Sequence, residues 1–339
     1  MTLLIIIILV ALLFDFLNGM NDAANSIATV VSTRVLTPRL AVLWAAFFNF
    51  VAAFGFGVAV ANTIGKGIVD PNIVTQELIL SALVGAIVWT YLCTYFGFPI
   101  SVSHALIGGL AGSALVKAGT APLITSGIYK VLLFIFLSPL IGLVVAFSLT
   151  IAVSWLFRRS SGRRVDRVFR IGQLLSSAAF SLGHGTNDAQ KTMGIISILL
   201  FSANVGIPSW MYDKSLGFHV PFWVVIAAHT AIGLGTLTGG WRVIRTLGIK
   251  LTHLKPVGGF CAETGGAFVL LGTALAGIPV STTHTIVGAI MGVGATRRMS
   301  AVRWGVAGKI VAAWILTIPT SALVAGLIYY LLSLAHLHS

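Results

Sequence analysis

The sequence has 339 residues, of which 57% are hydrophobic and only 9% are charged. Soluble domains usually contain about 25% charged residues, so this composition excludes an ordinary soluble protein. Uncharged runs such as 41–62 and 131–157 match the roughly 20 residues that a helix needs to cross a bilayer. The chain is therefore expected to be an all-α integral membrane protein surrounded by the lipid bilayer.

The net charge of +13 raises the alternative of a protein that binds nucleic acid, but the distribution of the charge argues against it. Most Lys and Arg residues fall in four short connections between apolar runs, at 34–39, 158–170, 242–255 and 297–303. Basic residues gather in this way in the cytoplasmic loops of membrane proteins. We expect a multi-pass protein of the cell membrane (inner or plasma) and no nucleic-acid partner.

Apolar segments are predicted at corresponding places in the two halves of the chain. They cover 3–33, 40–62, 77–97, 98–116 and 128–157, and then 171–206, 221–240, 257–277, 278–294 and 304–335. The first segment of each half is expected to be interrupted near an Asn-Asp pair, and the fourth to form a helical hairpin. The last contains Pro139 or Pro319 and is either one kinked helix or two shorter pieces. Roughly ten to twelve membrane segments result.

Two polar motifs occur once in each half and in the same order. GMNDAANS at 19–26 returns as GTNDAQKT at 185–192, and PISVSH at 99–104 returns as PVSTTH at 279–284. Duplicated motifs that interrupt apolar helices are typical of transporters built from two related halves around one site. The predicted division is an N-terminal membrane repeat at 1–157, a short basic cytoplasmic linker at 158–170 and a C-terminal membrane repeat at 171–339.

The charges of corresponding loops predict that the second repeat is inverted relative to the first. The connection 34–39 is basic, whereas its counterpart 207–220 contains one Lys and one Asp. One segment later the pattern reverses, because 62–76 balances one Lys against one Asp whereas 241–256 carries four basic residues. The positive-inside rule then places the linker 158–170 in the cytoplasm and both termini outside. The exact number of spans stays open.

Asp22 and Asp188 are carboxylates deep inside apolar segments, where a charge is unfavourable unless it faces a cation or a polar cavity. Their small neighbours permit local unwinding, which would free carbonyl oxygens to bind a cation such as Na⁺ beside each carboxylate. A hydrogen-bond knot between helices is the structural alternative. The predicted coupling-cation residues are Asn21, Asp22, Asn25, Asn187, Asp188 and Gln190.

The motif Pro-[Ile/Val]-Ser-x-[Ser/Thr]-His predicts a helix start that binds an anion. Proline suits the first turn of a helix, and a helix N-terminus offers unpaired N–H groups and the positive end of the dipole. Two such ends from inverted halves would suit a small tetrahedral oxyanion. Ordinary N-capping by serine is the structural alternative. The predicted substrate residues are Ser101, Val102, Ser103, Ser281, Thr282 and Thr283.

Four further polar residues in apolar surroundings are secondary candidates. His104 and His284 either relay protons or hold the hairpins through hydrogen bonds, and we favour the structural role. Lys191 is an intramembrane cation that pairs with the preceding carboxylate or attracts the anion. Glu263 binds a cation or belongs to a polar network. His184, next to the second Asn-Asp motif, is expected to serve in packing.

No catalytic constellation is present in the sequence. It contains no GxxxxGK[ST] phosphate loop, no nucleophile elbow and no His/Cys ligand cluster. Cys93 and Cys261 lie singly in apolar runs. Neither an enzyme nor an ATP-driven pump is expected, and no cofactor is predicted beyond a coupling ion.

Together these motifs resemble those of the inorganic phosphate transporter (PiT) family, whose hallmark is a duplicated Gly-x-Asn-Asp-x-x-Asn signature. The resemblance covers essentially the whole chain. It implies a secondary symporter that imports inorganic phosphate with Na⁺ or H⁺ by alternating access, commonly as a homodimer. It also implies that the cation binds at the Asn-Asp motifs and phosphate at the hydroxyls of the second motif. The alternatives are a permease for sulfate or another tetrahedral anion, and a passive anion channel.

Two features depart from the family pattern. The linker 158–170 is far shorter than the cytoplasmic domain of animal relatives, so no regulation through it is expected. The two motif copies differ at 24–26 and 190–192. The predicted site is therefore asymmetric, and cation positions do not transfer one to one between the halves.

Overall fold

The computed structural model describes residues 1–55, 57–203 and 206–337. Within these ranges the chain is folded almost entirely into helices, with no strand and one isolated bridge between Val69 and Leu123. The remaining residues fall in the predicted segments 40–62 and 171–206 and at the end of the predicted repeat 171–339. Those parts of the predictions lie outside the described residues.

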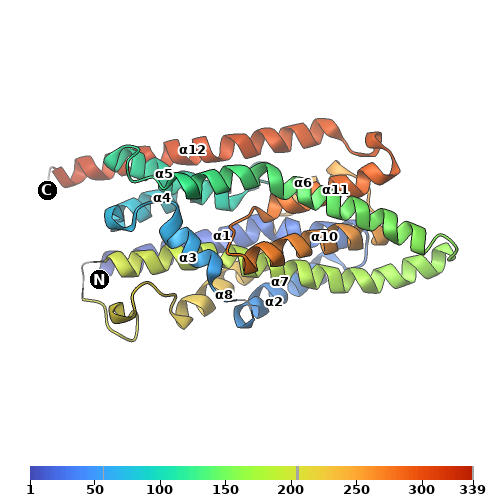
Figure 1. The fold of residues 1–339 in the computed structure, drawn as a ribbon, viewed down its shortest axis with the longest axis horizontal. Helices are drawn as coiled ribbons and strands as arrows, with labels where there is room; N and C mark the ends of the chain where they lie inside the picture. Colours follow the sequence, from blue (N-terminus) through green and yellow to red (C-terminus); the bar gives the residue numbers. More distant parts are fainter. Residues whose placement is uncertain (56, 204–205, 338–339) are drawn as a thin grey trace.

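Among the described residues, six α-helices precede the turn at 157–161 and six follow it (Figure 1). The first half contains α1 (Thr2–Ser32), α2 (Pro38–Val51), α3 (Ala59–Gly67), α4 (Gln76–Phe96), α5 (Val102–Ala118) and α6 (Thr125–Leu156). The second half contains α7 (Gly162–Ser202), α8 (Phe222–Thr238), α9 (Trp241–Arg245), α10 (Pro256–Leu275), α11 (Thr282–Arg297) and α12 (Trp304–Leu337). The short turns are η1 (Ala52–Phe54), η2 (Pro71–Ile73), η3 (Lys214–Leu216), η4 (Thr246–Leu251, π-helical) and η5 (Met299–Ala301).

Local sequence explains where several of these helices begin and end. The Thr37 and Thr75 side chains accept N–H groups at the starts of α2 and α4, which is the preferred chemistry of an N-cap. Gly97 ends α4 with φ 76°, a left-handed conformation that a glycine adopts without a steric penalty. Ser101 and Ser281 cap α5 and α11 in the same way as the threonines. The motif serines therefore define both helix starts.

The expected interruption of the helices at the Asn-Asp pairs is wrong. α1 and α7 are both continuous through these positions. The motif side chains do not compete with their own backbone, which is how such residues usually break a helix, because they bond to distant helices instead. Asn21 Nδ2 donates to Thr94 Oγ1 on α4 at 2.7 Å. The carbonyl oxygens of these turns are consequently held in the helix and are not freed for a cation.

Two further predictions about long segments are resolved by the structure. Residues 162–170, expected as part of a loop, form the first turns of α7, where Arg170 pairs with Asp166 one turn earlier at 2.9 Å. α6 and α12 are single helices with Pro139 and Pro319 inside them. The division into repeats at 1–157 and 171–339 with a linker between them stays a prediction.

The two halves are interlocked through glycine contacts. α5 packs against α12, and α11 packs against α6. A Cβ on Gly112 would lie 2.1 Å from the Ala322 carbonyl oxygen, and one on Gly288 would lie 2.1 Å from the Pro139 carbonyl oxygen. Each of these glycines belongs to a Gly-x-x-x-Gly spacing, which lets two membrane helices approach closely. α5 of the first half is thereby fixed to α12 of the second half, and α11 of the second half is fixed to α6 of the first.

Helix length and surface both match a bilayer environment. Among the described helices, α1, α4, α6, α10 and α12 are long and apolar enough to span a membrane, and up to seven spans result if each bent pair of helices counts as one. One such pair is α8 followed by α9 and η4, with a bend of 63°. Large apolar side chains such as Phe136 and Leu323 are more than 70% exposed, as expected where lipid surrounds the helices. The count of ten to twelve segments stays a prediction.

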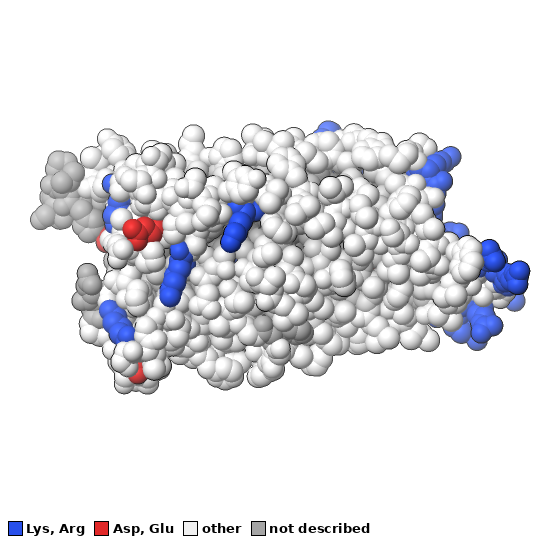
Figure 2. Space-filling model, in the orientation of Figure 1, with Lys and Arg blue, Asp and Glu red and all other residues white. Residues whose placement is uncertain are grey.

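Charged side chains gather at the two ends of the molecule, and most of the visible face between them is uncharged (Figure 2). Both termini lie at one end and the α6–α7 turn lies at the other (Figure 1). Other basic connections lie near this turn, since Arg170 donates to the Arg34 carbonyl oxygen at 2.9 Å. Arg34, Arg242 and Arg245 line one cavity of about 650 Å³ there. The end with the α6–α7 turn is hereafter called the basic end.

Candidate functional site

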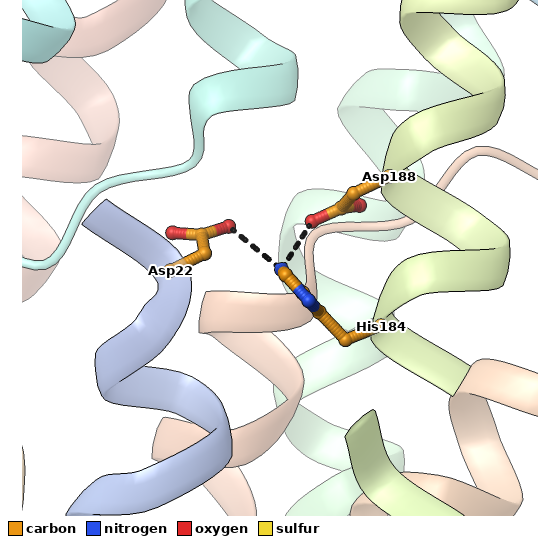
Figure 3. Close-up of side chains that lie close together, drawn as sticks. All are labelled: Asp22, His184 and Asp188. Carbon is orange, nitrogen blue, oxygen red and sulfur yellow. Dashed lines mark ion pairs between the residues drawn. The ribbon is translucent and has the colours of Figure 1, made fainter. Parts of the chain in front are cut away.

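Two carboxylates and an imidazole lie close together in the buried interior (Figure 3). Asp22 comes from α1, and His184 and Asp188 lie one turn apart on α7. His184 Nε2 lies 3.2 Å from Asp188 Oδ2 and 3.8 Å from Asp22 Oδ2, and all three side chains are at most 3% exposed. Two buried carboxylates beside the same imidazole ring repel each other unless a positive charge lies between or beside them. The predicted convergence of Asp22 and Asp188 is therefore present in the structure.

His184 was expected to serve in packing, but it belongs to this cluster. Its Nδ1 lies 3.0 Å from Asn49 Oδ1 on α2, so the ring is held from behind by an amide. A neutral imidazole that donates from Nδ1 presents a lone pair on Nε2, and this arrangement is common in metal-binding histidines. The ligand atoms of Asp22, His184 and Asp188 lie within 4.8 Å of one another and could hold a metal ion. The donor set thus fits a cation.

Lys191 is fully buried beside the cluster, one turn after Asp188 on α7. Its ammonium forms an ion pair with Asp188. It also donates to Ser103 Oγ at 2.5 Å and to the Val280 carbonyl oxygen at 2.9 Å. These contacts satisfy all three protons of the ammonium. Of the two roles considered for Lys191, pairing with Asp188 is the one that the contacts display.

The second pair of motifs brings the starts of α5 and α11 to the same place. Ser101 Oγ and Ser281 Oγ each accept the N–H group of the histidine three residues later, at 3.2 Å. These two hydroxyls are therefore occupied as caps. The hydroxyl of Thr282 lies 3.1 Å from Asp22 Oδ2 and 2.9 Å from Asp188 Oδ2. The duplicated motifs thus meet through direct contacts between one half and the other.

The site contains more oxygen acceptors than protons to fill them. Thr283 Oγ1 lies 3.2 Å from Asp22 Oδ1 and 2.9 Å from the Ile100 carbonyl oxygen, yet a hydroxyl donates only one proton. Asn25 Nδ2 donates to Thr283 Oγ1 at 2.9 Å, while Asn25 Oδ1 is buried without a hydrogen-bond partner. Buried acceptors normally find a donor. An excess of oxygen atoms favours a cation here.

The helix starts also offer donors for an anion. In the described structure the N–H groups of Val102 and Ser103 have no hydrogen-bond acceptor, because the bonds at this end begin with His104 and Ala105. The corresponding N–H groups on α11 are free in the same way. Free N–H groups at a helix start, reinforced by the dipole, bind phosphate-like anions. Anion donors and cation acceptors therefore lie side by side.

Two of the predicted cation residues have partners of other kinds, and a third has none among the described residues. Asn21 bonds to α4, as described above. Gln190 Oε1 accepts the N–H groups of Val60 and Ala61 at 2.8 and 3.2 Å and so caps the start of α3. Asn187 is fully buried, and neither of its amide atoms has a hydrogen-bond partner among the described residues. The contacts of Asn21 and Gln190 explain their position without a cation.

His104 and His284 lie against each other with ring centroids 4.8 Å apart. His284 also stacks on Trp314 of α12 at 3.7 Å. Trp314 in turn donates its Nε1–H to the Pro99 carbonyl oxygen at 3.0 Å. This aromatic group connects the starts of α5 and α11, and the structural role of the two histidines stays a prediction.

Glu263 forms a second buried polar cluster on α10. Its carboxylate accepts the hydroxyls of Thr29 and Ser176 at 2.5 Å each and Gln173 Nε2 at 3.0 Å. Thr29 lies one turn of α1 beyond Asn25, on the way to the cavity at the basic end, which Ala28 and Ser32 help to line. Polar side chains therefore continue along α1 from the central site toward this cavity.

Comparison with known proteins identifies the group to which the chain is similar. A family model described as the phosphate transporter family matches residues 18–325. A probable low-affinity inorganic phosphate transporter of Rhizobium meliloti (strain 1021) is 57% identical over 97% of this chain and 96% of its own. One of Bacillus subtilis (strain 168) is 42% identical over 97% of both chains.

A solved structure agrees with this assignment. The sodium-dependent phosphate transporter is 29% identical and superposes with a TM-score of 0.88, over 98% of this chain and all of its own. The family resemblance and the predicted helical membrane fold are both confirmed, and the relatives are transporters and not enzymes. The chain is a multi-pass membrane protein that belongs to the phosphate transporter family.

Proposed function

We propose that this protein imports inorganic phosphate together with a cation by alternating access. The observation that carries the proposal is the meeting of Asp22 and Asp188 with the free N–H groups of α5 and α11 in the buried centre. A transporter that couples two solutes needs both sites close together, so that each ligand stabilises binding of the other. The relatives that match nearly the whole chain are named as phosphate transporters.

The charges favour phosphate held between the helix starts. The free N–H groups of Val102 and Ser103, with their counterparts at Thr282 and Thr283, surround a position from two sides. A hydroxyl can both donate and accept, so Ser103 suits an anion that is still partly protonated. Asp188 is paired with Lys191, but Asp22 would repel the anion unless a cation accompanied it. Obligatory binding of both ions follows from this arrangement.

Na⁺ is the coupling ion that we favour over H⁺. The solved relative of the same fold is sodium-dependent, and the oxygen atoms around Asp22 are ligands that a hard cation prefers. Thr282 lies between the two carboxylates, so a cation at Asp22 would change the contacts of the substrate residues. We assign cation binding to Asp22, Asn25 and the Thr283 hydroxyl, and phosphate binding to the Ser103 hydroxyl and the N–H groups of Val102, Ser103, Thr282 and Thr283.

The proposed topology puts the basic end in the cytoplasm and both termini outside. Four basic connections gather at the end that contains the α6–α7 turn, which the positive-inside rule assigns to the cytoplasm. α5 of the first half packs against α12 of the second half, and α11 of the second half packs against α6 of the first. This reciprocal packing supports two inverted repeats. The cavity beside Arg34 and Arg242 would then be the cytoplasmic exit for phosphate. A homodimer is also proposed, from the family resemblance.

Uptake of radiolabelled phosphate into proteoliposomes tests the function. We expect uptake with an inward sodium gradient at equal pH on both sides, accumulation above the outside concentration, and little inhibition by sulfate. Asp22→Asn should abolish the sodium-driven uptake. Uptake that never exceeds equilibration would favour a passive channel, and uptake driven only by a proton gradient would replace Na⁺ with H⁺.

A further inference from the structure

The internal duplication allows the two halves of the site to be compared atom by atom. When the Asn-Asp pairs are aligned, Asn25 corresponds to Lys191, since each follows its aspartate by three residues. When the Pro-Ser motifs are aligned, Ser103 corresponds to Thr283. In the structure, Asn25 donates to Thr283 and Lys191 donates to Ser103. Each of these pairs joins one half of the chain to the other. Each aspartate therefore has a matching set of oxygen ligands supplied by both halves.

One set surrounds Asp188. It consists of the Asp188 carboxylate, Ser103 Oγ and the Val280 carbonyl oxygen, and all three are bonded to Lys191 Nζ. A carboxylate, a hydroxyl and a backbone carbonyl are the kinds of oxygen that transporters use to bind a small monovalent cation. The lysine ammonium thus takes the place that a bound cation would take. We call this set the Asp188 cage.

The corresponding set surrounds Asp22 and has no lysine. It consists of the Asp22 carboxylate, Thr283 Oγ1 and the carbonyl oxygen of Ile100, which corresponds to Val280. Where the other half has Lys191, this half has Asn25, whose side chain is 1% exposed and whose Oδ1 lacks a hydrogen-bond partner. A single hydroxyl proton cannot satisfy both of its neighbouring acceptors. We call this set the Asp22 cage.

We propose that Lys191 is a tethered cation that permanently fills the Asp188 cage, so that only the Asp22 cage binds an exchangeable Na⁺. The inference rests on the proposed function and deepens it, because it sets how many coupling cations move with each phosphate. A covalently attached ammonium neutralises Asp188 in every step of the cycle and cannot be released. A chain with Asn in both positions would bind one more cation.

Equilibrium binding of radiolabelled sodium to the purified, reconstituted protein in the presence of phosphate tests the proposal. Lys191→Asn should raise the number of sodium ions bound per protomer by one, because it makes the Asp188 cage match the Asp22 cage. Lys309→Asn, which removes an exposed lysine on α12, should leave the number unchanged. Sodium should also raise the melting temperature of Lys191→Asn more than that of the wild type, since a ligand stabilises the state that binds it.

The reciprocal variant gives an independent measurement. Asn25→Lys places an ammonium in the Asp22 cage and should abolish sodium binding. Equal sodium counts in the wild type and Lys191→Asn, or undiminished binding by Asn25→Lys, would overturn the proposal, and a wild type that binds no sodium would overturn the Asp22 cage. Phosphate uptake is measured on the same vesicles. Lack of uptake by the wild type refutes the proposed function, whereas the sodium counts decide the role of Lys191 by themselves.

Discussion

Asp188→Asn measures how much the buried ion pair with Lys191 contributes to stability. Lys191 is 1% exposed, and its ammonium would keep only two neutral acceptors, Ser103 Oγ and the Val280 carbonyl oxygen. Removal of one partner of a buried ion pair lowers the free energy of unfolding by about 3–5 kcal/mol. The single amide oxygen of asparagine can still accept the Thr282 hydroxyl, but the amide nitrogen then faces the ammonium, so the loss combines the missing charge with one missing acceptor. We expect a decrease of about 3–4 kcal/mol.

Asp22→Asn is the matched control. Asp22 accepts the same kinds of hydroxyls, but among the described residues it forms no ion pair with Lys or Arg. The amide oxygen of asparagine can accept one of these hydroxyls, and its amide nitrogen can donate to the other, so the expected decrease is about 1 kcal/mol. Reversible unfolding in mixed detergent and dodecyl sulfate micelles, followed by circular dichroism, gives both values.

The double variant Asp188→Asn with Lys191→Met separates the charge from the shape of the site. It removes both members of the pair, so no uncompensated charge stays buried. We expect it to be more stable than Asp188→Asn alone by about 2 kcal/mol. Equal destabilisation by Asp188→Asn and Asp22→Asn, or a double variant no better than the single one, would refute the reasoning.

Three further predictions concern packing, the helix starts and topology. Gly112→Ala should lower the unfolding free energy by about 1–3 kcal/mol, because its methyl group would lie 2.1 Å from a carbonyl oxygen. Gly272→Ala has open space around its methyl group and should not lower it. Similar values for both variants would contradict the close packing. Ser103→Ala should reduce phosphate uptake about tenfold, because a hydrogen bond to a charged group is lost. Ser101→Ala removes a helix cap, so it should lower the unfolding free energy by about 1 kcal/mol and keep most of the uptake. Equal losses of uptake in the two variants would contradict these roles. A cysteine at Ser161 should react with an impermeant maleimide only from the cytoplasmic side, and labelling from outside intact cells would refute the topology.

Much of the fold could be predicted because its boundaries are written locally. Apolar runs end at glycine, proline or a capping hydroxyl, and the predicted segments match the observed helices to within a few residues at most ends. The duplication of the two motifs also indicated which residues form the candidate site. Asp22 and Asp188 were predicted from their cost inside a membrane, and Thr282, which contacts both, was predicted from the duplicated motif.

The remaining features depend on partners that are distant in sequence. The Asn-Asp motif looks like a helix breaker until Asn21 is seen to bond to Thr94, more than 70 residues away. The assumed break also concealed His184, because its spacing of four residues from Asp188 matters only on a continuous helix. Gln190 resembled a cation ligand because nothing in the neighbouring sequence reveals that it caps α3.

The glycine contacts between the halves restrict how the molecule can move. α5 touches α12, and α11 touches α6, with backbone against backbone at Gly112 and Gly288. We therefore expect the start of α5 to move together with α12, and the start of α11 to move together with α6, because close-packed backbones do not slide past each other easily. His104 of α5 and His284 of α11 lie against each other. Any motion of one helix pair relative to the other should therefore change this aromatic contact.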